Sequence, residues 1–163
     1  MMALNISYQK EDQLAGALHA LGVNFVLGGK GEGGSFLTKP NLLIAALTQS
    51  SEARLRLSLI PLFLERPEYA AYVRETAKHL APTAQLTLQC YYTAAVLLAQ
   101  KYPQLNIALS NYFVDTLNLS PVNDPDENLR TLAKRHKALS GSHVNWLATY
   151  RHAERVWRKG KVK

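Results

Sequence analysis

The chain has 163 residues, of which 47% are hydrophobic and 19% charged, and its formal net charge is +7 at pH 7. This composition is typical of one globular domain and excludes a chain that is disordered throughout. The single cysteine, Cys90, excludes an intramolecular disulfide, and no secretory signal pattern opens the sequence, so we expect a cytoplasmic protein.

Apolar residues recur at helical spacing along most of the chain. The first predicted helix covers residues 10–21. The residues that follow, 23–27, form a short β-prone run, which is the one strand-like segment of the sequence. The Gly-rich stretch over 28–37 is predicted to be a flexible surface loop, because its glycines cost conformational entropy and offer no side chains.

From residue 40 onward the helical pattern is nearly continuous, and prolines mark its divisions. Pro67 and Pro82 suit the first turn of a helix, whereas Pro61 falls inside an apolar run and should kink or split that helix. The segment 86–99 carries no charge and is too short to span a membrane, so we expect it at the centre of the core. The helices predicted here span 41–49, 52–64, 67–80, 82–102 and 104–117.

The last two helices are predicted from their boundaries. Asp124, Pro125 and Glu127 form a helix start with a cap, a first-turn proline and an N3 acid, and that helix should run to residue 139. Residues 140–142 then break the chain before a helix over 143–158. The predicted fold is one all-α domain over 1–163, an irregular bundle of about seven or eight helices with one short strand near 23–27.

Positive charge is concentrated in the basic C-terminal hairpin and tail, residues 130–163. This segment holds ten of the 19 Lys and Arg residues and one of the 12 acidic residues. A helical wheel places the aromatic residues of the last helix on one arc and its cations on another. Such a surface favours an anionic macromolecule, which can be RNA, DNA or an acidic protein. The residues expected to bind it are Arg130, Lys134, Lys137, Arg151, Arg155, Arg158 and Lys159.

Two helices joined near residues 139–142 also allow a helix-turn-helix interpretation. Ser142, His143 and Asn145 would then open the recognition helix, since these residue types can reach base edges. A generic helical hairpin is the other interpretation of the same residues.

Arg130 is followed by five residues and then by His136. This spacing resembles the Arg-x(4–6)-His signature of HEPN domains, which are small helical proteins and often ribonucleases. The resemblance implies a metal-independent pair in which His136 moves a proton and Arg130 stabilises the charge on phosphorus. Thr131 stands where that family usually has Asn, Asp or His. Because His136 lies on an apolar stripe, a packed core residue is the alternative interpretation.

Residues 21–29, with Gly28 and Gly29 after an apolar run, are similar to the strand and turn that open minimal nucleotidyltransferases. That chemistry needs a pair of metal-binding acids shortly afterwards, and 39–46 contains none, so we do not predict it. The stretch 41–101 resembles uncharacterised bacterial helical domains found beside such enzymes. The five histidines have no metal-ligand spacing, and we expect neither metal nor cofactor.

The sequence therefore predicts a non-catalytic helical interaction module that binds an anionic partner through its last two helices. The alternative is a HEPN-like ribonuclease or toxin-antitoxin component that uses Arg130 and His136. Homo-oligomerisation stays open, because an apolar helix face can be either core or a dimer contact. That face consists of Leu55, Leu57, Leu59 and Ile60.

Overall fold

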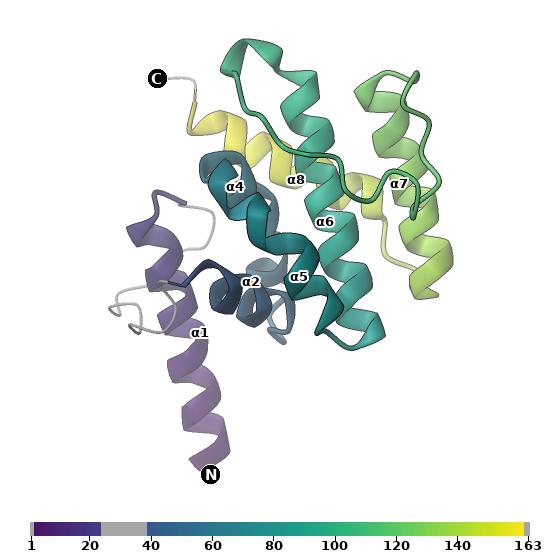
Figure 1. The fold of residues 1–163 in the computed structure, drawn as a ribbon. Helices are drawn as coiled ribbons and strands as arrows, with labels where there is room; N and C mark the ends of the chain where they lie inside the picture. Colours follow the sequence, from purple (N-terminus) through teal and green to yellow (C-terminus); the bar gives the residue numbers. More distant parts are fainter. Residues whose placement is uncertain (1, 24–38, 162–163) are drawn as a thin grey trace.

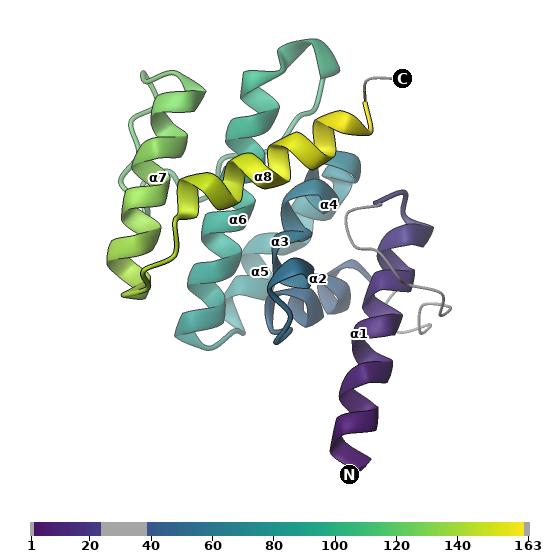
Figure 2. The same ribbon diagram turned by 180° about the vertical axis from the view of Figure 1, so that it is seen from behind.

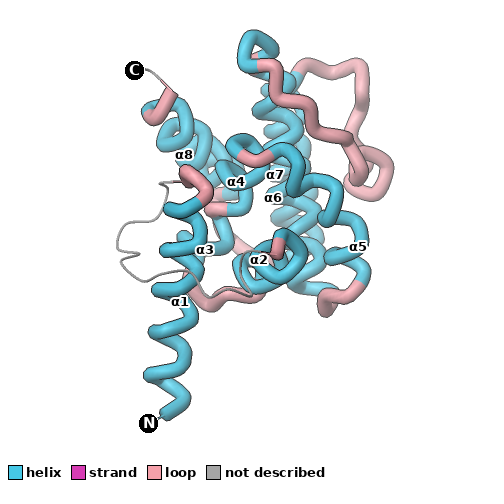
Figure 3. The backbone as a smooth tube through the Cα atoms, turned by 60° about the vertical axis from the view of Figure 1, so that its left-hand side comes forward, coloured by secondary structure: helices cyan, strands magenta, loops and turns pink. Residues whose placement is uncertain are grey.

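The computed structural model describes residues 2–23 and 39–161, with side chains over 11–23 and 39–161. All regular structure in these ranges is helical, and Figure 3 accordingly shows helices and loops. The predicted all-α irregular bundle is thus confirmed. The predicted strand over 23–27, apart from the buried Val23, and the predicted Gly-rich loop over 28–37 lie outside the described residues.

Prolines open several of the helices, as the sequence indicated, because a first turn loses nothing when an amide hydrogen is missing. Pro40, Pro82 and Pro125 each stand at the start of an α-helix. The elements are α1 (Met2–Ala20), α2 (Pro40–Thr48), α3 (Ala53–Leu57), α4 (Leu59–Glu65), the 3-10 helix η2 (Pro67–Tyr72), α5 (Val73–Lys78), α6 (Pro82–Lys101), the 3-10 helix η3 (Pro103–Leu105), α7 (Pro125–Ser140) and α8 (Trp146–Lys159).

Pro61 splits the helix predicted over 52–64, but the break lies upstream of the proline. A proline ring clashes with the carbonyl group four residues earlier, which here belongs to Leu57. Accordingly α3 ends at Leu57, Ser58 separates the two helices, and Pro61 sits in the first turn of α4.

The helix predicted over 104–117 is wrong. Asn106 has a left-handed backbone with φ 55°, which ends η3 after one turn. Residues 106–124 then run as a loop across α6 to α7 (Figure 1). The loop is held by the Tyr92 hydroxyl, which donates to the Ser110 carbonyl at 2.6 Å, and by buried apolar side chains. These side chains are Phe113, Leu117 and Leu119.

Helix α6 is the centre of the bundle, as the uncharged stretch 86–99 predicted. Residues 90–99 are all buried, and α4, α5 and α7 pack around them (Figure 1). One apolar face could be either core or a dimer contact on the evidence of the sequence. It belongs to this same core, because each of its members is at most 7% exposed. These members are Leu55, Leu57, Leu59 and Ile60.

Helix α8 crosses one side of the bundle, running from beside α7 over α6 toward α4 (Figure 2). Its inward side chains Tyr150, Ala153 and Trp157 are buried, as the helical wheel predicted. The outward side of this crossing helix carries the cations described next.

Candidate functional site

Helix α7 presents a row of three cations because its other side is fixed to the core. The Asp124 carboxylate accepts a hydrogen bond from the Glu127 amide at 2.9 Å and so caps the first turn, as predicted. Gly141, with φ 67°, ends the helix in the left-handed conformation that glycine tolerates. Arg130, Lys134 and Lys137 lie at i, i+4 and i+7 and are all exposed.

Helix α8 repeats the same spacing. Asn145 caps it by accepting a hydrogen bond from the Ala148 amide at 3.0 Å. Arg151, Arg155 and Arg158 occupy positions i, i+4 and i+7, and Arg155 is exposed while the other two are partly exposed. Lys159 is exposed beside them. The two helices therefore each carry a stripe of cations on their outer surface.

A network of polar contacts fixes α8 against α6 and α7. The Glu154 carboxylate, 8% exposed, receives the Lys101 ammonium at 2.7 Å and a hydrogen bond from the Tyr102 hydroxyl. Lys101 also lies 3.2 Å from the Asp126 carboxylate in the first turn of α7. Burial lowers the pKa of Lys101, but its hydrogen bonds to Glu154 and Asp126 outweigh this and raise the pKa overall.

The C-terminal end of α8 is held by α4 in the same way. The Trp157 indole N–H donates to the Glu65 carboxylate at 3.2 Å, and the Lys161 ammonium reaches the same carboxylate at 2.8 Å. The Arg158 guanidinium lies 4.4 Å from the centre of the Tyr102 ring, a cation–π contact. Arg158 thus belongs to the anchor of the helix as well as to its outer stripe.

The remaining predicted binding residues have no carboxylate partner in the part of the chain that the structure describes. The ion pairs there involve Arg66, Lys78, His79, Lys101 and Lys161. The cations outside these pairs on α7 and α8 include Arg130, Lys134, Lys137, Arg151, Arg155 and Lys159.

A shallow depression lies at the junction of α7 and α8, where the two Lys residues Lys134 and Lys137 meet the loop after the helix. Gly141, Ser142 and His143 supply the loop side of this depression. From the sequence, Ser142 and His143 would open a recognition helix and reach base edges, and nothing placed them beside these lysines. Their placement beside the two lysines depends on the left-handed turn at Gly141, and the helical pattern alone gives no signal for it.

The geometry of the loop before α8 gives little support to the helix-turn-helix interpretation. The Ser142 hydroxyl accepts a hydrogen bond from the Val144 amide at 3.1 Å, and the side-chain Oδ1 atom of Asn145 accepts the Ala148 amide in the cap of α8. Both side chains therefore shape the loop and the helix start, which favours the helical hairpin.

Arg130 and His136, the candidate ribonuclease pair, are not brought together. Arg130 is exposed, whereas His136 is 1% exposed and its ring stacks on Trp146 with centroids 3.5 Å apart. The His136 Nδ1 atom shares a 2.6 Å hydrogen bond with the Tyr150 hydroxyl, and Tyr91 contacts the ring edge-on. Burial lowers the pKa of His136 to about 4. This environment favours the interpretation of His136 as a packed residue.

Among the described residues, the one thiol is a further candidate for a reactive group. Cys90 is fully buried, and burial raises its pKa to about 12, so the thiol is protonated at neutral pH. Within the ranges described, no group of three or more His, Cys, Asp or Glu residues is placed to hold a metal ion. No helix among these residues has the length and apolar character that crossing a membrane requires.

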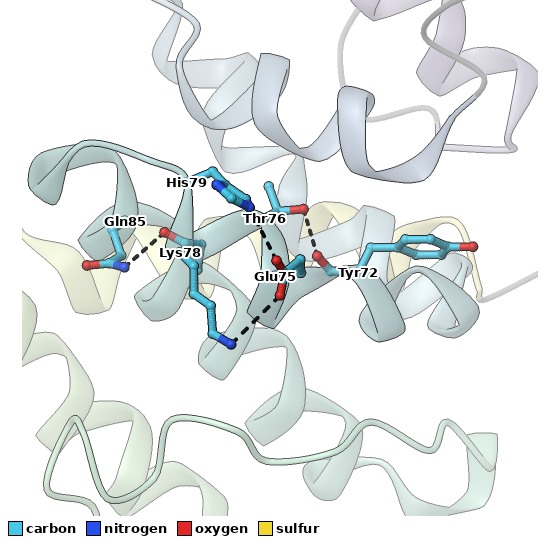
Figure 4. Close-up of polar contacts among 7 residues, drawn as sticks. Tyr72, Glu75, Thr76, Lys78, His79 and Gln85 are labelled. Atoms are coloured by element: carbon cyan, nitrogen blue, oxygen red, sulfur yellow. Dashed lines mark hydrogen bonds and ion pairs between the residues drawn. The ribbon is translucent and has the colours of Figure 1, made fainter.

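A groove between α2 and α5 is another surface feature of the described residues, with Leu42 and Tyr72 exposed along it. Several polar groups at this groove are engaged within the protein, as Figure 4 shows. Glu75 lies 3.2 Å from His79 and 3.7 Å from Lys78, and the Thr76 hydroxyl donates to the Tyr72 carbonyl. Glu75, Thr76 and His79 are thus engaged within the protein.

Comparison with known proteins gives no relative: no family model matches the chain, and neither a curated protein nor a solved structure is detectably similar to it.

Proposed function

We propose that this protein is a non-catalytic helical interaction module, and that the outer cations of α7 and α8 bind an anionic partner. The observation that carries the proposal is that these cations are set out on two helices without carboxylate partners among the described residues. Cations left unpaired in this way keep their full attraction for a partner and raise its rate of encounter.

The rigidity of the two helices supports the same proposal. Because Tyr150 and Trp157 are buried and Glu154 is bound to Lys101, α8 holds its outer stripe in a fixed position. A partner that binds this surface does not have to order a flexible segment first, so little of the binding free energy is lost to conformational entropy.

The ribonuclease alternative has weaker support. A catalytic histidine must come within hydrogen-bonding distance of the substrate, and the His136 ring is enclosed by Trp146, Tyr150 and Tyr91. We also propose a reducing, cytoplasmic location, which rests on the lone and buried Cys90.

Elution from immobilised heparin, a generic polyanion, tests the proposal. Three variants each lose three positive charges, and the charge is removed at a different place in each. The first is Arg130→Gln/Lys134→Gln/Lys137→Gln on α7, the second Arg151→Gln/Arg155→Gln/Lys159→Gln on α8, and the control Arg54→Gln/Arg74→Gln/Lys78→Gln, all exposed or partly exposed positions.

We expect the α7 and α8 variants to elute at clearly lower salt than the control variant. If all three variants elute together, the protein responds only to net charge, and the proposed surface is wrong. Circular dichroism of each variant confirms that the helices are retained.

A further inference from the structure

The depression at the C-terminal end of α7 is lined by side chains that can bind phosphate. They are Lys134, Lys137, Ser142 and His143, and Ala138 and Gly141 complete the lining. The Ser142 oxygen accepts the Val144 amide, so its hydroxyl hydrogen remains to donate to an anion. Together these side chains supply ammonium, hydroxyl and imidazole donors, which are the groups that surround bound phosphate in proteins.

The surrounding charge favours an anion at this place. No acidic residue occurs between Glu127 and Glu154, a span that contains both lysines and the loop. The depression lies at the C-terminal end of α7, where the helix dipole contributes roughly half a negative elementary charge. Two full positive charges on Lys134 and Lys137 exceed that contribution, so the net field still attracts an anion.

The length of the cation stripe distinguishes a polymer from a single anion. Arg130 and Lys137 are seven residues apart, which corresponds to about 10 Å along a helix axis. A strand of duplex nucleic acid presents one phosphate for about every 3.4 Å of its axis, so a stripe of this length can meet more than one phosphate. An isolated phosphate would use the depression and leave Arg130 without a role.

The aromatic residues argue against a single strand. Single-stranded nucleic acids bind proteins through bases stacked on exposed aromatic rings. The aromatic residues of α7 and α8 are Trp146, Tyr150 and Trp157, and none of them is exposed. Contact with the sugar-phosphate backbone is what these helices can offer.

We propose that the depression binds a backbone phosphate of double-stranded nucleic acid, with the Arg130–Lys134–Lys137 stripe following the strand and without preference for base sequence. This inference rests on the proposed function and specifies its partner. Phosphate contacts of this kind position a duplex and carry no sequence information.

Binding of labelled duplex DNA and RNA across a salt series tests the proposal. The test variant is Lys134→Gln/Lys137→Gln, and the matched control is Arg54→Gln/Lys78→Gln, which removes the same charge at exposed positions elsewhere. Each lost phosphate contact reduces the slope of log K against log salt by about 0.9, so we expect the test variant, which removes both lysines from one phosphate, to lose about 0.9 in slope. The control should keep the wild-type slope.

Other results would overturn the proposal in distinguishable ways. A test variant with the wild-type slope refutes the phosphate site, while the proposed function still stands on the heparin result. Tighter binding to a single strand than to the duplex refutes the partner. Binding to anionic phospholipid vesicles is measured as well, because the apolar side chains of Leu139 and Val144 are exposed next to the lining residues in sequence. Binding to vesicles without binding to duplex would make the partner a membrane surface.

Discussion

His136 is a titratable side chain surrounded by aromatic rings. It is buried against Trp146 and Tyr150, and burial lowers its pKa from 6.5 to about 4. As the pH falls, the unfolded chain therefore binds a proton before the folded protein does. The contribution of neutral His136 to the free energy of unfolding is therefore fully present above about pH 6.5. It declines toward pH 4, by about 3 kcal/mol for a pKa difference of this size.

Urea unfolding between neutral and mildly acidic pH measures this effect. In the His136→Gln protein we expect a lower stability at neutral pH, because ring stacking is lost, but a much weaker decline as the pH falls. The control is His79→Gln directly after α5, where the side chain is largely exposed. An unchanged decline in the His136→Gln protein would show that other groups cause the loss of stability in acid.

At the scale of single residues, the sequence distinguished inner from outer positions well. The apolar stripe of α7 predicted that His136 packs inward, and the wheel of α8 predicted buried Tyr150 and Trp157. The sequence did not predict the contacts of Arg158 with Tyr102 or of Lys101 with Glu154. These pairs are far apart in sequence, and helical periodicity carries no information on which helices become neighbours.

Helix α7 depends on its N-terminal cap. The Asp124 carboxylate satisfies the Glu127 amide, which otherwise lacks a partner in the first turn. We expect Asp124→Ala to lower the free energy of unfolding by about 1 kcal/mol. Asp115→Ala is the control, because Asp115 is an exposed acid in the loop before α7. Equal stability of the two variants, measured by thermal unfolding, would contradict the capping role.

At the scale of elements, boundaries marked by local chemistry were predictable, and those set by tertiary contacts were not. The signals at Asp124 and Pro125 predicted the start of α7 correctly. The segment 104–117 has helical apolar spacing, yet it forms a loop whose buried residues, such as Leu117, reach the core without a helix. Asn106 in the left-handed conformation and the Tyr92–Ser110 hydrogen bond decide this, and neither can be read from periodicity.

At the scale of the whole molecule, α8 belongs to the core as well as to the basic surface. Removing the chain after Leu139 would remove the buried side chains of Tyr150 and Trp157 and expose the core that they cover. Burial of a large side chain of this kind contributes roughly 1.5–3 kcal/mol to stability. Truncation therefore cannot separate binding from folding. Substitution of the outer cations can separate binding from folding, because those side chains lie outside the buried core.

The site itself was predictable only in part. Composition located the positive charge in the last two helices, and the wheel placed the cations outward. The depression formed by Lys134, Lys137 and the loop at Ser142 requires the turn geometry at Gly141. Its shape is a property of the assembled hairpin.

The central claim is that the outer cations of α7 and α8 bind an anionic partner without catalysis. In the most direct measurement, labelled double-stranded RNA is incubated with the wild type and with a variant that combines the α7 and α8 substitutions. Both the binding and the length of the RNA are then recorded. We predict that the wild type binds, that the combined variant does not, and that the RNA stays intact. Equal binding by both proteins, or RNA that the wild type shortens and His136→Gln leaves whole, would contradict the account.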